Sequence, residues 1–322
     1  MTRVVEGGAA AKAAVPPSKQ SRGLPRWRRE RVAGLLFLLP ALVYVVAFYA
    51  YPIAFNVLMS LEKYTLKTFV TGEAPFIGLD NFKHLVNNPE FWPAVVNTVW
   101  FTVGSLFFQF TLGLLIALFY QHKFPLNSIL RALILVPWLA PVLVSGAIWV
   151  RLFDQDTGVI NFAIHSLGYQ GQISWLTDPH LSLISVLIAN IWIGIPFNMV
   201  ILYGGLQAIP RVLYEAASID GASAWQRFRY ITWPLLRPVS TVVLLLGLVY
   251  TLKVFDVIMS ITRGGPADTS QTLNTWAYSL AFTNGFDFGL GAVAGDILLV
   301  IVFAFGMLYL RYAYRELRET AS

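Results

Sequence analysis

Most of the residues that could do chemistry in this chain lie in one short polar block between two long apolar stretches. Residues 214–238 read YEAASIDGASAWQRFRYITWPLLRP and hold two acids and three arginines. There is no cysteine, and no G-x-x-x-x-G-K-[ST] segment that would bind nucleotide phosphates. The sequence therefore predicts no catalytic residue, no metal site and no cofactor in this chain. The histidines agree, because they are scattered without the close spacing of metal ligands: His84, His122, His165 and His180.

The elements that position this block are predicted to cross a membrane. Apolar residue types make up 57% of the 322 residues and charged types 12%, against about 45–50% and about 25% in soluble domains. Windows of about 20 apolar residues, enough to cross roughly 30 Å of hydrocarbon, recur along the chain. The predicted fold is an all-α polytopic membrane protein with six transmembrane helices, at Val32–Tyr51, Ala94–Tyr120, Ser128–Val150, Leu181–Leu206, Val239–Ile261 and Leu290–Leu310.

The distribution of Lys and Arg predicts the orientation. Seventeen of the 23 basic residues lie in the N-terminal tail, around the 121–127 loop, in the 207–238 loop or after the last span. The positive-inside rule then places both termini and the 207–238 loop in the cytoplasm. This topology accounts for the net charge of +6, so nucleic acid is not expected as a partner. The predicted organisation is a tail at 1–31, whose first 25 residues have a disordered composition, a six-helix membrane domain at 32–311 and a tail at 312–322.

The polar block itself is predicted to form two short helices. Tyr214–Ile219 favours a helix, led by Pro210 and with Glu215 in its first turn. Asp220-Gly221 breaks it, because glycine accepts backbone angles that other residues avoid. A second helix is expected over Ala222–Ile231, ended by the prolines at 234 and 238. Small residues near the bend would make a narrow protrusion that fits a groove in another protein; the alternative is an ordinary amphipathic cytoplasmic loop.

This loop resembles the E-A-A-x3-G-x9-I-x-L-P signature of permease subunits of binding-protein-dependent ABC importers. Trp233 departs from the pattern, since the family usually has Leu there. Three further segments resemble the carbohydrate branch, which includes maltose and glycerol-3-phosphate permeases. They are 220–228 (D-G-A-x-x-W-Q-x-F), 255–266 (F-D-x-I-x-x-L-T-x-G-G-P) and 76–82 (F-x-G-L-x-N-[FY]). The signature positions that match are Glu215, Ala216, Ala217, Gly221, Ile231 and Pro234.

The resemblance implies a type I ABC importer permease in a bacterial or archaeal plasma membrane. In that family the signature loop is a coupling helix seated in a groove of a separate ATPase subunit, so the signature residues are expected to transmit ATP-driven motion. The implied partners are a dimer of ATPase subunits that binds ATP and Mg, a second homologous permease, an extracytoplasmic solute-binding protein and membrane lipid. No enzymatic activity is implied for this chain.

Two helix faces are predicted to border the solute path. They combine amide and hydroxyl groups with small and aromatic residues, which suit a neutral sugar, although Gly and Thr are as common in helix packing. Lys253 and Asp256, three residues apart, are expected to pair within one helix, and Pro137 and Pro141 to kink the third span. The two faces repeat at helical spacing on the fourth and fifth spans: Asn190, Gly194 and Phe197, and Gly247, Thr251 and Val254.

Three alternatives remain open at the level of the sequence. A secondary transporter or channel would need no ATPase, but it predicts broken helices or inverted repeats, and the sequence gives no sign of either. An ABC permease for amino acids or peptides is disfavoured by the carbohydrate-like segments. Glycerol phosphate is disfavoured as a solute because the cores of the predicted spans hold one cation, Lys253, whereas Arg131 lies at the end of its span.

Overall fold

The computed structural model describes residues 26–122, 124–283 and 285–321. Within these residues the regular elements are helices, and the only β pairing consists of two isolated bridges, Glu62–Phe76 and Thr65–Asp287. The chain divides into two compact units at residue 53. The first contains α1 (Arg26–Val45), the π-turn η1 (Val46–Ala50) and the start of α2 (Tyr51–Ser60). The disordered segment predicted at residues 1–25 lies outside the described residues.

Most of the predicted spans are present as helices long and apolar enough to cross a membrane. Five such helices occur among the described residues, or six if one bent pair is counted as a single span. Those that follow the predicted positions to within a few residues are α5 (Phe91–Phe119), α10 (Ser182–Gln207) and residues 288–309 of α16 (Phe288–Ala321). The first span is longer than predicted, because the helix continues from Gly34 to Ser60.

The third predicted span is broken. Helices α6 (Asn127–Ile134) and α7 (Val136–Leu139) run into α8 (Val142–Leu152) with a bend of 96°. Ala140 has ψ 140°, outside the helical region, as expected for a residue that precedes a proline. The predicted kink at Pro141 is therefore confirmed, whereas Pro137 lies in the first turn of α7, where proline is tolerated. The expectation that the chain has no broken helix was wrong.

The fifth span was predicted at Val239–Ile261, but the helix begins and ends earlier in the chain. A helix runs without a break from Ala224 to Leu252 through α12 (Ala224–Arg227), the π-turn η2 (Phe228–Thr232) and α13 (Trp233–Leu252). Pro234 and Pro238 do not end it. In η2 the Trp233 N–H bonds to the Phe228 carbonyl, five residues back, and this wide turn accommodates Pro234, which has no N–H, at the start of α13.

The same prediction was wrong about Lys253 and Asp256. Lys253 follows the end of α13, and Asp256 is the first residue of a separate helix, α14 (Asp256–Ile261). Among the described residues these two form no ion pair; the Lys253 ammonium lies 4.9 Å from the Tyr250 ring centroid instead. An acid at the start of a helix interacts favourably with the helix dipole, so Asp256 needs no cation beside it.

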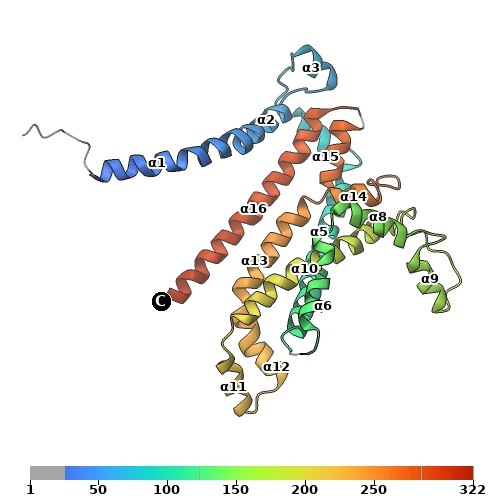
Figure 1. Ribbon diagram of the computed structural model, residues 1–322. Helices are drawn as coiled ribbons and strands as arrows, with labels where there is room; N and C mark the ends of the chain where they lie inside the picture. The colour runs from blue at the N-terminus through green and yellow to red at the C-terminus, as the bar shows by residue number, and fades with distance from the viewer. Residues whose placement is uncertain (1–25, 123, 284, 322) are drawn as a thin grey trace, which may run out of the picture. The chain divides into compact units, whose positions relative to one another are not determined.

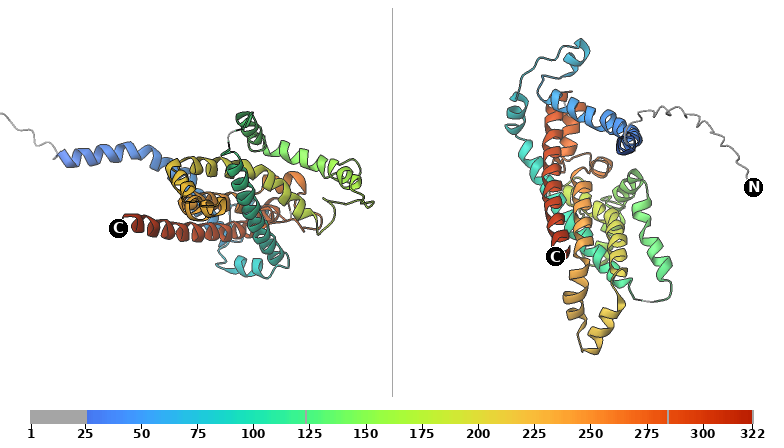
Figure 2. Two further views of the ribbon diagram at one scale, coloured as in Figure 1. Left: turned by 90° about the horizontal axis from the view of Figure 1, so that it is seen from below. Right: turned by 90° about the vertical axis from the view of Figure 1, so that its left-hand side faces the viewer.

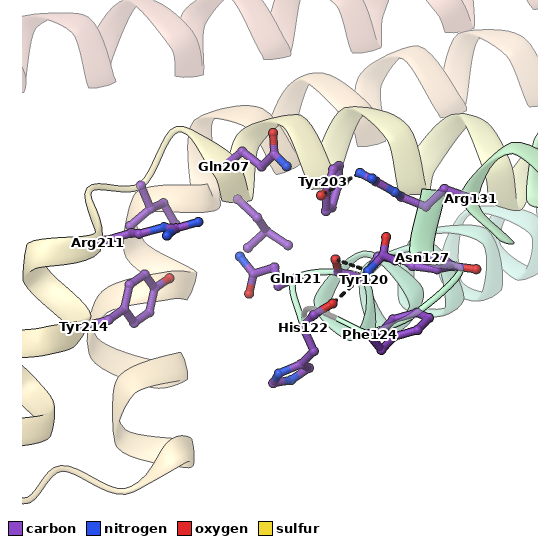
Figure 3. A pocket seen from close by; sticks show the side chains of 12 residues that line it. Tyr120, Gln121, His122, Phe124, Asn127, Arg131, Tyr203, Gln207, Arg211 and Tyr214 are labelled. Carbon is purple, nitrogen blue, oxygen red and sulfur yellow. Dashed lines mark hydrogen bonds between the residues drawn. The ribbon is translucent and has the colours of Figure 1, made fainter. Parts of the chain in front are cut away.

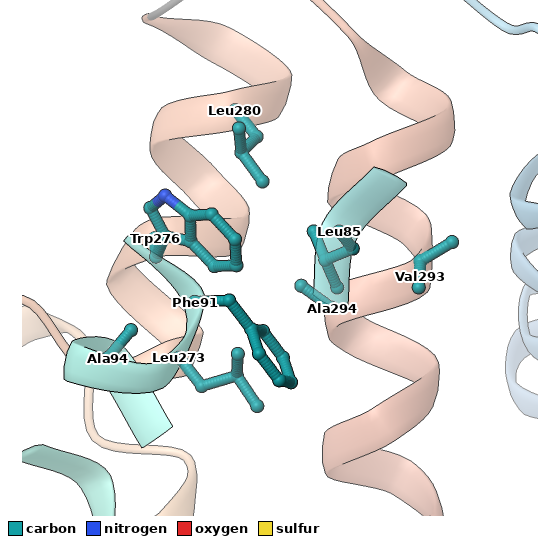
Figure 4. Packing of buried hydrophobic residues seen from close by; sticks show 8 residues of the cluster. All are labelled: Leu85, Phe91, Ala94, Leu273, Trp276, Leu280, Val293 and Ala294. Atoms are coloured by element: carbon teal, nitrogen blue, oxygen red, sulfur yellow. The ribbon is translucent and has the colours of Figure 1, made fainter. Parts of the chain in front are cut away.

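Packing of the second unit, residues 54–321, is centred on α5 and α10, which lie side by side (Figures 1 and 2). Gly113 of α5 allows this approach, because a Cβ there would lie 2.7 Å from Asn198 Cβ of α10. At one end of the unit, a core cluster joins α4 (Asp80–Val86), α5, α15 (Leu273–Phe282) and α16 around Phe91 and Trp276 (Figure 4). At the other end α11 (Arg211–Ile219) and α12 project together (Figure 1).

Candidate functional site

The projecting loop between α10 and α13 is a tightly specified helix–turn–helix. Helix α11 begins at Arg211 after Pro210, so Glu215 lies in its second turn, not in its first as predicted. Gly221 has φ +75°, and Ala222 N–H bonds to Ala217 O at 2.9 Å while Gly221 N–H bonds to Ser218 O at 3.2 Å. This is a Schellman motif, which requires a left-handed residue at the position of Gly221.

The second half of the loop is fixed by side chains. Ser223 caps α12 in a reciprocal capping box with Gln226. Arg227 then donates from Nη1 to Ser218 Oγ at 2.8 Å, which ties α12 back to α11. At the root of the loop, the hydroxyls of Tyr214 and Thr232 lie 2.9 Å apart. The direction in which α11 projects is therefore set by two hydrogen bonds, to α12 and to η2, at the start of the helix that continues into α13.

The tip of this loop exposes apolar side chains. Ile219 is 87% exposed and Trp225 is 69% exposed, with Trp225 stacked on Phe228 at 5.7 Å between ring centroids. Exposed large apolar groups of this kind mark surfaces that bind a partner. The six signature residues divide between tip and root: Glu215, Ala216, Ala217 and Gly221 lie at the tip, and Ile231 and Pro234 at the root.

The second candidate site is a cavity of about 240 Å³ between α5, α7, α10 and α13. All six residues of the two predicted faces line it: Asn190, Gly194, Phe197, Gly247, Thr251 and Val254. The structure therefore brings both faces together around one space. None of its ten lining residues is charged.

Part of this cavity wall is a helix-packing contact. Asn190 Nδ2 donates to Ser105 Oγ at 2.9 Å, and its carbonyl accepts from Gln109 Nε2 at 3.0 Å. A Cβ on Gly194 would lie 2.3 Å from Gln109 Cδ, and one on Gly247 would lie 2.8 Å from Leu106 Cδ2. Asn190 and the two glycines thus hold α10 and α13 against α5 at the same place where they line the cavity.

Aromatic residues that the sequence did not single out complete the cavity. Phe197 lies between Trp138 and Tyr250, at 5.8 and 5.9 Å between ring centroids. Trp138 reaches Phe197 from α7, just before the 96° bend. Gln109 could have been found from the sequence, because it is a polar residue within a long apolar helix. Trp138 could not, because its position at the cavity depends on the break between α7 and α8. Trp138 and Tyr250 are about half exposed, so the cavity opens at the surface of the chain.

The segments predicted to be extracytoplasmic are held by two side-chain amides, one buried and one half-buried. Asn81, in the 76–82 segment, donates to the carbonyls of Ser60 and Glu62 at 3.0 and 2.8 Å. Asn97 of α5 donates to the carbonyls of Thr269 and Gln271, at 3.0 and 2.9 Å, and so holds the loop that follows the 255–266 segment.

One acid of this loop has an altered pKa. Burial, with the negative charge of Glu90 adding to it, raises the pKa of the Asp268 carboxyl above its usual range. The Glu90 carboxylate is itself held, because it accepts a 2.8 Å hydrogen bond from the Trp276 indole.

Comparison with known proteins identifies close relatives over most of the chain. Residues 109–318 match the family described as binding-protein-dependent transport system inner membrane component. The trehalose/maltose transport system permease protein MalF of Thermococcus litoralis is 36% identical over 283 residues, which cover 88% of this chain and 94% of that protein. The lactose transport system permease protein LacF of Rhizobium radiobacter is 32% identical over 289 residues, covering 88% and 95%. A chain of a bacterial alginate ABC transporter, solved in complex with an alginate pentasaccharide-bound periplasmic protein, superposes with a TM-score of 0.77 at 24% identity, covering 90% of this chain and 97% of that one.

Proposed function

Because this chain belongs to the family of binding-protein-dependent transport system inner membrane components and is a permease subunit of a sugar ABC transporter, we propose that it moves a neutral di- or oligosaccharide into the cell. The six-span, type I importer fold predicted from the sequence agrees with its structural relatives. The energy comes from a separate ATPase, which binds ATP and Mg and acts on this chain through the 207–238 loop.

The composition of the cavity carries the proposal for a neutral sugar. Amide and hydroxyl groups come from Gln109, Asn190 and Thr251, and the ring faces come from Trp138, Phe197 and Tyr250. Hydroxyl-binding groups beside aromatic faces suit a sugar ring, whereas an anion inside a membrane calls for fixed cations. At about 240 Å³ the cavity opens at the chain surface, so a second, homologous permease supplies its opposite wall.

The loop geometry supports the coupling proposal. Ile219 and the exposed small residues Ala216 and Gly221 form a narrow tip on α11, and the tip is tied rigidly to the α13 helix that lines the cavity. A push on the tip by an ATPase groove therefore moves α13 and, with it, one wall of the cavity. This arrangement requires the loop and both termini in the cytoplasm, and the solute-binding protein on the opposite side.

The test is competitive uptake into proteoliposomes that contain this chain, its partner permease, the ATPase and the cognate binding protein. Uptake of a labelled neutral disaccharide such as trehalose or maltose, undiminished by an excess of acidic oligosaccharide, is the expected result. One structural relative is described as importing the acidic polysaccharide alginate, at 25% identity and a TM-score of 0.74. Preferential uptake of an acidic saccharide would overturn the neutral assignment.

The assembly is tested separately by native mass spectrometry of the purified complex. One copy of this chain, one copy of a second permease and two ATPase subunits are expected. Two copies of this chain with no second permease would contradict the heterodimer.

A further inference from the structure

A second, larger pocket lies away from the solute cavity, at the root of the projecting loop. It has a volume of about 840 Å³ and is bordered by the end of α5, the 120–127 turn (described at 120–122 and 124–127), α6, the end of α10 and the start of α11 (Figure 3). It shares no lining residue with the solute cavity. Three of its lining residues, Tyr120, Leu206 and Ile209, belong to one buried hydrophobic cluster, so part of the pocket wall is well packed.

The charges of this pocket are unbalanced. Its lining includes Arg131, Arg211 and His122 but no acid. Among the described residues, the one hydrogen bond of the Arg131 guanidinium goes from Nη1 to Tyr203 OH at 2.7 Å, and its Nε is buried without a partner. Arg211 forms no ion pair there, not even with Glu215 one turn further along α11. Cations without anionic partners favour the binding of a negatively charged group.

One end of the pocket is built to receive that group. The residues on both sides of Pro210, the N-cap of α11, line the pocket. Helix α11 has nine residues, and the positive end of its dipole adds to the charge of Arg211 at that end. Arg131 lies at the opposite end, beyond Gln207 and Tyr203 (Figure 3). The two arginines therefore lie at opposite ends of the pocket, and the end at Arg211 also has the start of a helix beside it.

The remaining lining groups suit hydroxyls. Gln121, Gln207 and Asn127 present amides, and Asn127 Oδ1 is buried with no hydrogen-bond donor among the described residues. The amides of Gln121 and Gln207 can donate to hydroxyl groups and accept from them, and Arg131 can donate to hydroxyl oxygens as well as to anions. Tyr120 and Phe124, stacked at 5.9 Å between ring centroids, add an apolar wall.

We propose that this pocket binds a hydroxylated phosphate ester, with the phosphate at Arg211 and the start of α11 and the hydroxyls at Arg131 and Gln207. Tyr214, which also lines the pocket, joins α11 to η2 through Thr232. A bound ligand therefore bridges the root of α11 to the 120–127 turn and biases how far the loop can move relative to α5. The site regulates coupling and lies outside the solute path. Two sources share this chemistry: a soluble sugar phosphate and the headgroup of phosphatidylglycerol.

The experiment uses the complete complex in nanodiscs. In phosphatidylcholine discs, binding of glucose 6-phosphate is compared with binding of glucose by isothermal titration calorimetry. In discs containing phosphatidylglycerol, bound lipid is counted by native mass spectrometry. The variants are Arg211→Gln, Arg131→Gln and the milder Tyr203→Phe, which removes only the hydroxyl that holds Arg131. Arg311→Gln is the matched control, because this exposed arginine of α16 loses the same charge outside the pocket.

Tight binding of glucose 6-phosphate in phosphatidylcholine discs identifies a soluble phosphate ester as the ligand. Phosphatidylglycerol retained by the complex identifies the lipid headgroup. Either result supports the site if the variants behave as follows. Arg211→Gln should lose at least about tenfold in affinity and remove the preference for phosphate ester over free polyol. Arg131→Gln should weaken binding of both ester and polyol, and Arg311→Gln should change neither. Absence of both ligands from the wild-type complex overturns the proposal, as does binding that Arg211→Gln, Arg131→Gln and Tyr203→Phe all leave unchanged.

Discussion

Substitutions at Gly221 test whether the conformation of this turn is needed for the proposed coupling of ATP hydrolysis to solute uptake. Gly221 has φ +75°, and a Cβ added there would meet no atom within 4 Å. A substitution at this position therefore changes the energy of the turn without creating a clash. An L-residue in the left-handed region costs roughly 1–2 kcal/mol, and less for Asn, whose side chain tolerates that region. A cost of this size lowers the equilibrium constant for the native turn by about 5–30-fold.

We expect solute uptake per hydrolysed ATP to fall along the series Gly, Asn, Ala, Pro at position 221. Proline falls furthest, because its φ is fixed near about −65° and because it removes the N–H that donates to Ser218 O at 3.2 Å. Glu215→Lys, which reverses the charge on the exposed tip, is expected to uncouple in the same way. ATP hydrolysis and uptake are measured together in proteoliposomes holding the complete complex at equal abundance.

Gly168→Ala provides the matched control for this series. Gly168 has φ +98° and also has no atom within 4 Å of an added Cβ, but it lies after α9 (Val159–Ser166), on the side predicted to face away from the ATPase. The strain is similar, yet full uptake is expected. If Gly221→Ala and Gly221→Pro import solute as efficiently as the wild type, the loop does not transmit the motion of the ATPase and the coupling argument is refuted.

Three further predictions concern the cavity, the loop near α15 and the α2–α16 contact. Gly194→Ala places a Cβ 2.3 Å from Gln109 Cδ; the displaced amide narrows the cavity, so the KM of uptake should rise about tenfold for a loss of about 1.4 kcal/mol, and an unchanged KM would count against the solute path. Asp268→Asn should raise the melting temperature at pH 7, because burial raises the pKa of this carboxyl and its ionised form is therefore disfavoured in the fold. The gain should disappear as the pH falls through that raised pKa, and a gain that persists at low pH would contradict this cause. Asp296→Leu removes the acceptor 2.7 Å from Asn56 Nδ2 and should lower the melting temperature through a loss of about 1–3 kcal/mol, whereas Asp296→Asn, which keeps an acceptor oxygen, should lower it less.

The sequence predicted the helical faces well, because helical spacing alone decides which residues share a side. Asn190, Gly194 and Phe197 line the same cavity as the face on α13, as their spacing requires. It predicted the limits of the α13 helix poorly. Pro234 and Pro238 predict the end of a helix. In the structure the π-turn η2 accommodates Pro234, and Pro238 lies inside α13. The hydropathy pattern also extended the predicted span through Lys253 into α14, because the apolar run continues although the helix ends at Leu252.

The broken third helix shows why the cavity could not be derived fully from the chain. Pro141 is visible in the sequence and predicts a kink, but the 96° angle depends on how α8 packs against α14. That packing is close, since a Cβ on Gly146 would overlap Ser260. The bend fixes where α7 ends, and therefore where Trp138 meets Phe197. Broken helices are typical of secondary transporters, but in this chain the break positions Trp138 in the aromatic wall of the cavity. Under the proposed function, the loop at 207–238, with its left-handed Gly221 and exposed tip, is the feature that distinguishes this chain from a secondary transporter, because a secondary transporter needs no contact with an ATPase.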